Sequence, residues 1–198
     1  SGNVSIFAAE KAAQMGARVI AMSDSGGYVL DEEGIDLEVI KQLKLKERAR
    51  ISLYPGRAGR GSYQEGASGI WKLPCGLALP CATQNELDLE DAKALVKGGI
   101  QALAEGANMP ATLEATKYLQ QQGVLFASGK AANAGGVAVS ALEMSQNSQR
   151  LSWSSEDVDM KLLDIMNRIF DAISQAAAQY ATPKDYVAGA NIAGFKKV

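Results

Sequence analysis

The chain contains no histidine, and only 2 of its 198 residues are cysteine. Without an imidazole it cannot use a Ser-His-Asp or Cys-His mechanism, and it cannot hold a histidine-ligated zinc ion. Cys75 and Cys81 are too few for a tetrahedral metal site or a disulfide framework. We therefore expect reduced thiols, a cytoplasmic protein and no metal, with any proton transfer left to lysine, tyrosine or a carboxylate.

The chain also lacks an excess charge of either sign and a long apolar run. Lys and Arg number 20 and Asp and Glu 22, which gives a net charge of −2 and no basic footprint for nucleic acid. No apolar run approaches the roughly 18 residues of a membrane span, and without a basic segment followed by an apolar one we expect no secretory signal. The chain begins with Ser1 instead of Met, so we expect a processed or partial chain.

What the sequence does have is an alternation of short apolar runs with helical stretches. The expected strands are 18–22, 76–80, 100–104 and 124–127. The expected helices are 3–15, 36–48, 88–97, 111–122, 136–150 and 155–180, with a loop over 55–69 and a helix start in 186–198. This order predicts an α/β fold: a doubly wound, Rossmann-like parallel sheet with a truncated first strand, in one NAD(P)-binding domain over 1–198.

The start of the chain resembles half of a dinucleotide-binding turn. Gly2 stands where the second glycine of G-x-G-x-x-G/A would precede a helix, and Ser5 is the small third residue. Asp24 follows the next strand at the position that meets the adenosine ribose. Ser25 supplies a hydroxyl, which suits a 2′-phosphate. A plain helix cap and a turn aspartate remain alternatives for Gly2 and Asp24.

Polar residues follow three of the expected strands. Thr83 and Gln84 come after the strand at 76–80, Asn108 after 100–104 and Asn133 after 124–127. Ligands bind outside the carboxyl ends of the strands in open parallel sheets. Asn and Thr both donate and accept hydrogen bonds, which suits a carboxamide and ribose hydroxyls. Each residue taken alone also fits a turn or a cap.

A basic run lies on or near the helix at 36–48. Its members are Lys41, Lys44, Lys46, Arg48 and Arg50. Such a run is either a solvated helix face or a source of one or two cations for a 2′-phosphate.

Seven motifs, in order along the chain, resemble the cofactor-binding domain of hexameric glutamate dehydrogenases. They are Ser-Gly-Asn-Val at 1–4, Ser-Asp-Ser-Gly at 23–26, Leu-Pro-Cys-Ala-Thr-Gln-Asn-Glu-Leu at 79–87, Ala-Glu-Gly-Ala-Asn-Met-Pro at 104–110, Lys-Ala-Ala-Asn-Ala-Gly-Gly-Val at 130–137, Leu-Glu-Met-Ser-Gln-Asn at 142–147 and Gly-Ala-Asn-Ile-Ala-Gly-Phe at 189–195. The resemblance implies reversible oxidative deamination of L-glutamate to 2-oxoglutarate and ammonia, with hydride transfer to NADP or, alternatively, NAD. It also implies a homo-hexamer for the full-length enzyme.

The resemblance also assigns roles to individual residues. The cofactor-binding residues it implies are Gly2, Asn3 and Val4 at the pyrophosphate, Asp24 and Ser25 at the adenosine ribose, Lys46 near the 2′-phosphate, and Thr83, Gln84, Asn108 and Asn133 at the nicotinamide end. Ser140 matches the serine that contacts the side-chain carboxylate of glutamate. The related leucine and phenylalanine dehydrogenases look apolar there, so Ser140 favours glutamate.

Two departures limit what this chain can do. The family's proton-transferring Lys and Asp lie in an N-terminal domain that this sequence does not contain, so we expect no turnover from the chain alone. The absent first strand should leave unpaired backbone edges and a tendency to self-associate. Two other functions remain open: a leucine- or phenylalanine-type dehydrogenase domain, and a non-catalytic dinucleotide-sensing module.

Overall fold

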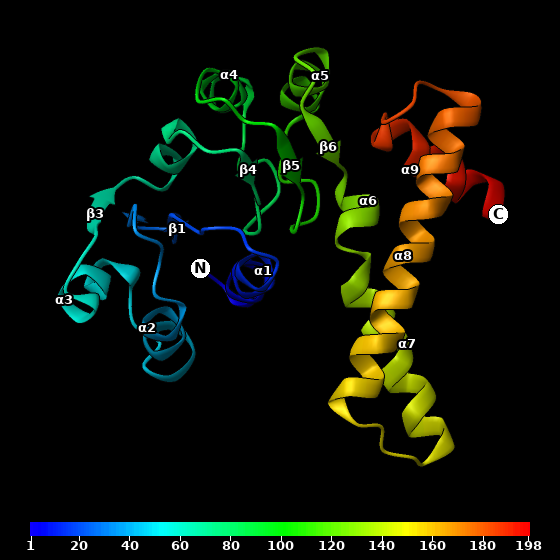
Figure 1. The fold of residues 1–198 in the computed structure, drawn as a ribbon, viewed down its shortest axis with the longest axis horizontal. Helices are drawn as coiled ribbons and strands as arrows, with labels where there is room; N and C mark the ends of the chain where they lie inside the picture. The colour runs from blue at the N-terminus through cyan, green and yellow to red at the C-terminus, as the bar shows by residue number, and fades with distance from the viewer. The chain divides into compact units, whose positions relative to one another are not determined.

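The computed structural model describes residues 1–198 and divides them into two units, Ser1–Val124 and Leu125–Val198 (Figure 1). Unit 1 contains α1(Asn3–Gln14), β1(Ala21–Ser23), β2(Gly27–Leu30), α2(Leu37–Lys41), the π-helix η1(Gln42–Lys46), η2(Ile51–Leu53), α3(Tyr54–Ala58), β3(Ser62–Glu65), η3(Ala67–Lys72), β4(Leu77–Ala78), α4(Leu89–Lys97), β5(Ala102–Ala104) and α5(Leu113–Gln121). Unit 2 contains β6(Leu125–Ala127), α6(Gly129–Ala132), α7(Ala134–Gln149), α8(Ser155–Tyr180) and α9(Tyr186–Lys197). The sequence predicted a single domain over this range.

The first sheet of unit 1 is antiparallel, which corrects the expectation of parallel strands throughout. β2 pairs with both β1 and β3, in the order β1-β2-β3. The chain reverses at Asp24–Gly27, where the Asp24 N–H donates to the Gly27 carbonyl at 2.9 Å. A side chain at Gly27 would come within 2.0 Å of the Gln64 carbonyl oxygen, so only glycine lets β3 approach here. The stretch expected as a loop over 55–69 therefore supplies α3 and the edge strand β3.

The second sheet confirms the parallel βαβ arrangement. β4 pairs with β5 in parallel, with Leu77 opposite Ala102 and Ala78 opposite Leu103. α4 connects the two strands and packs against α5 (Figure 1). Asp88 begins α4 with a capping box, in which its side chain accepts from the Asp91 N–H. The carboxyl ends of β4 and β5 therefore lie at one edge, where the predicted polar loops begin.

The core of unit 1 lies between α1, α2 and the antiparallel sheet. Its buried members include Ile6, Val29, Ile40 and Leu43, none of which has exposed surface. A buried tyrosine, Tyr54, closes this core. Its hydroxyl donates to Asp31 at 2.8 Å and accepts the Asp36 N–H at 2.8 Å. This pair of bonds fixes α3 to the end of β2 and to the start of α2.

Unit 2 is a helical assembly built on α8. α7 and α9 both pack against this helix of 26 residues (Figure 1). α8 begins with a capping box at Ser154 and Asp157, and α9 begins at Asp185, whose side chain accepts the Ala188 N–H. The stretches predicted as helices over 136–150, 155–180 and the tail from 186 are confirmed. No helix of the structure combines the length and apolarity that crossing a membrane requires.

Candidate functional site

The first turn of α1 is an exposed helix N-terminus that no side chain caps. Gly2 is its N-cap, and the first turn contains no acidic residue, whereas α2, α4 and α5 each have a side-chain cap. A Cβ at Gly2 would have no atom within 4 Å, and the buried hydroxyl of Ser1 has no hydrogen-bond partner. Free N–H groups and the positive end of the helix dipole attract anions. This end of α1 fits a pyrophosphate.

The Asp24 carboxylate at the end of β1 faces into the protein. Its side chain is only 8% exposed. One oxygen accepts the Gly26 N–H at 2.9 Å, and the other accepts the Ile51 N–H at 3.2 Å. The Lys44 ammonium lies 3.6 Å from the second oxygen. Asp24 therefore organises the loop beside β1, and its oxygens are already engaged.

Asp24, Ser25, Lys44 and Arg50 form a group that we call the Asp24 cluster. The guanidinium of Arg50 and the hydroxyl of Ser25 lie on its outside. Arg50 Nη1 donates to Ser25 Oγ at 2.6 Å and lies 4.0 Å from Asp24 Oδ2, while its side chain is 65% exposed. Lys44 reaches the cluster from the π-helix η1 and also donates to the Ala49 carbonyl at 3.1 Å. Lys46, the lysine predicted near a 2′-phosphate, is exposed and contacts neither Asp24 nor Ser25. The cations that the fold brings here are Lys44 and Arg50.

The pKa of Asp24 lies below its ordinary value. Burial by itself raises this pKa, but the N–H groups of Gly26 and Ile51 and the charges of Lys44 and Arg50 together lower it. Because the carboxyl titrates lower in the folded than in the unfolded chain, its ionised form stabilises the fold above the ordinary value of 3.8. That stabilisation is lost as the pH falls through the lowered pKa.

We expect Asp24→Asn to lower the free energy of unfolding at pH 7 by about 1 to 2 kcal/mol, because a hydrogen-bonded charge is lost. The difference between wild type and variant should shrink as the pH falls below the ordinary carboxyl range. Urea unfolding across pH measures it, with the exposed Asp159→Asn as a control that changes the same group in α8. A difference that stays constant with pH would contradict this role for the Asp24 charge.

The loops that follow β4 and β5 are joined by backbone hydrogen bonds. The N–H groups of Gly106 and Ala107 both donate to the Pro80 carbonyl, at 2.9 and 3.0 Å. The Asn85 N–H donates to the Met109 carbonyl at 3.0 Å. The three predicted cofactor residues of these loops, Thr83, Gln84 and Asn108, are all exposed. The structure thus places them on two adjoining loops at one edge of the sheet.

The α1 turn lies between these loops and the Asp24 cluster. On one side, the amino group of Ser1 donates to the Ser23 carbonyl at the end of β1. On the other side, a Cβ at Gly106 would lie 3.3 Å from Val4 and 2.5 Å from the Cys81 sulfur. The absence of a side chain at Gly106 lets α1 approach the loop after β5. An extended ligand would meet the Asp24 cluster, the helix end and the polar loops in that order.

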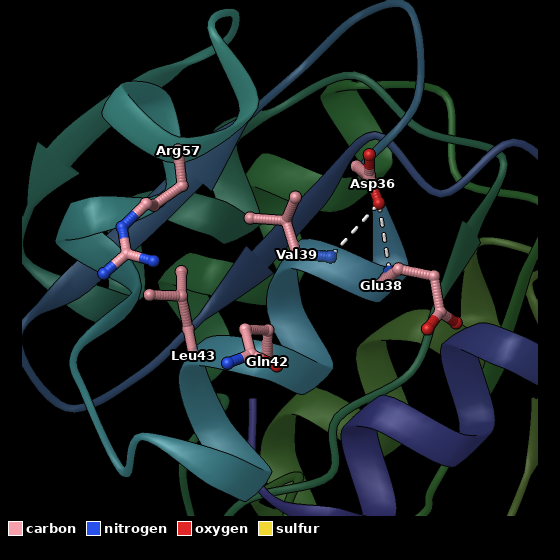
Figure 2. Close-up of a pocket in the computed structure, with 6 residues that line it drawn as sticks. All are labelled: Asp36, Glu38, Val39, Gln42, Leu43 and Arg57. Atoms are coloured by element: carbon pink, nitrogen blue, oxygen red, sulfur yellow. Dashed lines mark hydrogen bonds between the residues drawn. The ribbon is translucent and has the colours of Figure 1, made fainter.

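A pocket of about 260 Å³ lies elsewhere in unit 1, between α2, η1 and α3 (Figure 2). It is lined by Asp36, Glu38, Val39, Gln42, Leu43 and Arg57. Its charged groups are engaged: Asp36 accepts the Glu38 and Val39 N–H groups, and Arg57 pairs with Glu47 at 3.1 Å. None of the predicted cofactor residues lines it, so this pocket is separate from the candidate site.

Unit 2 holds the remaining two predicted residues, Asn133 and Ser140. Asn133 joins the C-terminus of α6 to the N-terminus of α7. Ser140 is exposed on α7, and its hydroxyl donates to the Gly136 carbonyl at 3.3 Å. Lys130 donates to Asn191 Oδ1 at 2.6 Å, which ties α6 to α9. Lys130 therefore has a structural partner within unit 2.

Sequence reasoning missed two features of the site. Arg50 was one cation among five in a run, and only the fold brings it to Ser25. Glu86 was quoted within a motif without a role of its own. Its contact with the Ala82 N–H forms only when the loop folds back. The spacing of four residues between Ala82 and Glu86 was the only signal available.

Comparisons with known proteins show which family the chain resembles. The family model described as Glutamate/Leucine/Phenylalanine/Valine dehydrogenase matches residues 1–198. The NADP-specific glutamate dehydrogenase of Escherichia coli (strain K12) is 52% identical over 201 residues, which cover 100% of this chain and 44% of that protein. The enzyme of the same name from Helicobacter pylori (strain J99) is 46% identical over 204 residues, which cover 100% of this chain and 46% of that protein.

A solved structure of a glutamate dehydrogenase has the same fold as this chain. The crystal structure of Plasmodium falciparum glutamate dehydrogenase superposes with a TM-score of 0.93 at 43% identity, covering 99% of this chain and 43% of that one. The chain spans a little under half the length of the relatives it matches. The α/β fold class expected from the sequence is confirmed. The chain belongs to the glutamate/leucine/phenylalanine/valine dehydrogenase family.

Proposed function

We propose that this chain is the cofactor-binding part of an NADP-dependent glutamate dehydrogenase. The complete enzyme would interconvert L-glutamate with 2-oxoglutarate and ammonia. The observation that carries the proposal is the uncapped N-terminus of α1 flanked by the Asp24 cluster and by the loops after β4 and β5. Two relatives named NADP-specific glutamate dehydrogenase, 46% and 52% identical, support the choice of substrate and cofactor.

The Asp24 cluster favours NADP over NAD. A free carboxylate at this position would accept the 2′-hydroxyl of NAD. Asp24 is instead buried and already bonded to the Gly26 and Ile51 N–H groups. What remains exposed is Arg50 with Ser25, a cation and a hydroxyl suited to a phosphate. Lys44 offsets the charge of Asp24, which would otherwise repel the phosphate.

The other predicted residues would hold the rest of the cofactor. Gly2, Asn3 and Val4 would offer backbone N–H groups to the pyrophosphate at the start of α1. When bound, the cofactor supplies the hydride acceptor or donor of the reaction. The exposed side chains that would orient its nicotinamide end are those of Thr83, Gln84 and Asn108.

For two residues of unit 2 we propose the roles that the family resemblance implies. Asn133 would bond the carboxamide, since an amide both donates and accepts. Ser140 would bond the side-chain carboxylate of glutamate, because its exposed hydroxyl can turn from the Gly136 carbonyl toward an anion. We assign no catalytic residue to the chain, and the proton-transferring Lys and Asp are proposed to lie outside residues 1–198. The complete enzyme is proposed to be a cytoplasmic homo-hexamer.

The test is an assay of the full-length protein with glutamate, leucine and phenylalanine, each with NADP and NAD. We expect NADP reduction with glutamate and less than about a hundredth of that rate with the apolar amino acids, because a site that bonds a carboxylate rejects substrates without one. Residues 1–198 alone should give no turnover.

Each rival function predicts a different outcome. Higher rates with leucine or phenylalanine would assign the protein to the apolar branch of the family. Cofactor binding without turnover of any amino acid by the full-length protein would indicate a dinucleotide-sensing module. Glutamate-dependent reduction by residues 1–198 alone would show that the catalytic groups lie within this chain.

A further inference from the structure

The loop after β4 folds back so that its backbone meets the side chain of Glu86. Glu86 Oε1 accepts the Ala82 N–H at 2.8 Å, and the Thr83 N–H also donates to this carboxylate. Successive N–H groups around one anion make a compact nest. A single side chain therefore holds two successive backbone nitrogens, those of Ala82 and Thr83.

The far end of the same loop is fixed by a second, independent contact. Asn85 has a left-handed backbone with φ of 56°, and Met109, across the site, has φ of 50°. The Asn85 N–H donates to the Met109 carbonyl at 3.0 Å, which joins these two residues. Left-handed non-glycine residues persist only where the surroundings hold them, and they gather at ligand sites. Thr83 and Gln84 thus project from a loop that is held at both ends.

The loop keeps the Glu86 charge at a cost to stability. Burial raises the pKa of Glu86, and the Ala82 and Thr83 N–H groups offset this only in part. The folded chain therefore favours the protonated form more than the unfolded chain does, so stability falls as the carboxyl ionises. The other titratable neighbour is Cys81. Burial raises the pKa of its thiol to about 11. The charge of Glu86 therefore does not stabilise the fold, and what the side chain contributes is the hydrogen bonds that hold the loop.

We propose that Glu86 is a positioning residue for the nicotinamide end of the cofactor, which holds the Ala82–Asn85 loop so that Thr83 and Gln84 meet that end in a fixed geometry. This inference rests on the proposed function. Glu86 acts through the backbone of the loop and is not itself assigned a contact with the ligand. Its loss should therefore weaken contacts at one end of the cofactor only.

The test compares two ligands and three variants of the full-length protein. NADPH spans the whole site, whereas adenosine 2′,5′-bisphosphate carries only the adenosine end and the 2′-phosphate. Glu86→Ala removes the acceptor, Glu86→Gln keeps one carbonyl oxygen that can accept the same N–H groups, and Glu90→Ala removes an exposed carboxylate at the start of α4 that bonds Lys93.

We expect Glu86→Ala to weaken NADPH binding about tenfold or more, since two hydrogen bonds to a charged group are lost, and to leave the bisphosphate within about twofold of wild type. Glu86→Gln should restore most of the NADPH affinity, and Glu90→Ala should change neither ligand. Equal weakening of both ligands by Glu86→Ala, or unchanged NADPH binding, would overturn the inference. Wild-type protein that binds neither ligand would instead contradict the proposed function.

Discussion

Arg50→Ala should weaken NADPH binding by about 10- to 100-fold, the loss expected when a charge-assisted bond worth about 1.5 to 3 kcal/mol is removed. NADH binding should stay within about twofold of wild type, because NADH has no 2′-phosphate for the guanidinium to meet. The reason lies in the Asp24 cluster, where Arg50 is the exposed cation and is bonded to Ser25 at 2.6 Å. Isothermal titration calorimetry of the full-length protein with each cofactor measures both effects.

Lys46→Ala is the matched control for Arg50→Ala. Both residues are exposed and basic, and only four positions separate them. Lys46 contacts neither Asp24 nor Ser25, so its removal should lower NADPH affinity by less than about threefold, the effect of a screened surface charge. A larger loss with Lys46→Ala than with Arg50→Ala would mean that the residue suggested by the family resemblance holds the phosphate. The arrangement of the Asp24 cluster would then not be the basis of cofactor choice.

Gly189→Ala should destabilise unit 2 by about 3 kcal/mol, at the upper end of the cost of overpacking a helix contact. A Cβ at Gly189 would lie 2.3 Å from the Ile173 carbonyl oxygen and 3.1 Å from the Ala177 side chain. These atoms belong to α8 and cannot move without bending that helix. For a chain of 198 residues we expect the melting temperature to fall by about 6 to 12 °C.

Gly194→Ala provides the control for Gly189→Ala within the same helix. A Cβ at Gly194 would have no atom within 4 Å. Replacing a glycine at an open helical position stabilises by up to about 1 kcal/mol, because the unfolded chain loses freedom. Differential scanning calorimetry of both variants separates the two effects. If both glycines tolerate alanine equally, the close packing of α9 on α8 does not contribute to stability.

The parts of the fold that the sequence predicts well are those with strong local signals. α8 matches its expected range of 155–180, since Ser154 and Asp157 form a capping box ahead of an amphipathic run. The strands β4, β5 and β6 lie within the expected apolar runs. The second helix was expected over 36–48, but it changes to a π-helix at Gln42–Lys46, a local widening that helical periodicity does not reveal.

The antiparallel sheet shows where local signals fail. β3 has the sequence Ser-Tyr-Gln-Glu, which is polar and largely exposed, so no apolar run marked it. Its position depends on a contact between Gly27 and Gln64, which lie 37 positions apart. The assignment of a loop to residues 55–69 missed this because a single edge strand carries little burial of its own.

The residues of the candidate site also divide into those with a local sequence signal and those without one. Gly2, Asp24, Thr83 and Asn108 could be proposed because each follows or precedes a predicted element at a known spacing. Arg50 and Glu86 could not, because each acts through one contact formed only in the folded loop. The sequence also could not show that the Asp24 side chain points inward. This orientation changes the role that we propose for Asp24. The carboxylate organises the loop after β1 and leaves Ser25 and Arg50 as the exposed groups there.

The most direct test of the account is the calorimetric titration of the wild-type full-length protein with NADPH and with NADH under identical conditions. With Asp24 buried and Arg50 exposed, we expect NADPH to bind at least about tenfold more tightly than NADH, since a phosphate–guanidinium contact is worth about 1.5 to 3 kcal/mol. Equal affinity, or a preference for NADH, would contradict the claim that the Asp24 cluster selects NADP.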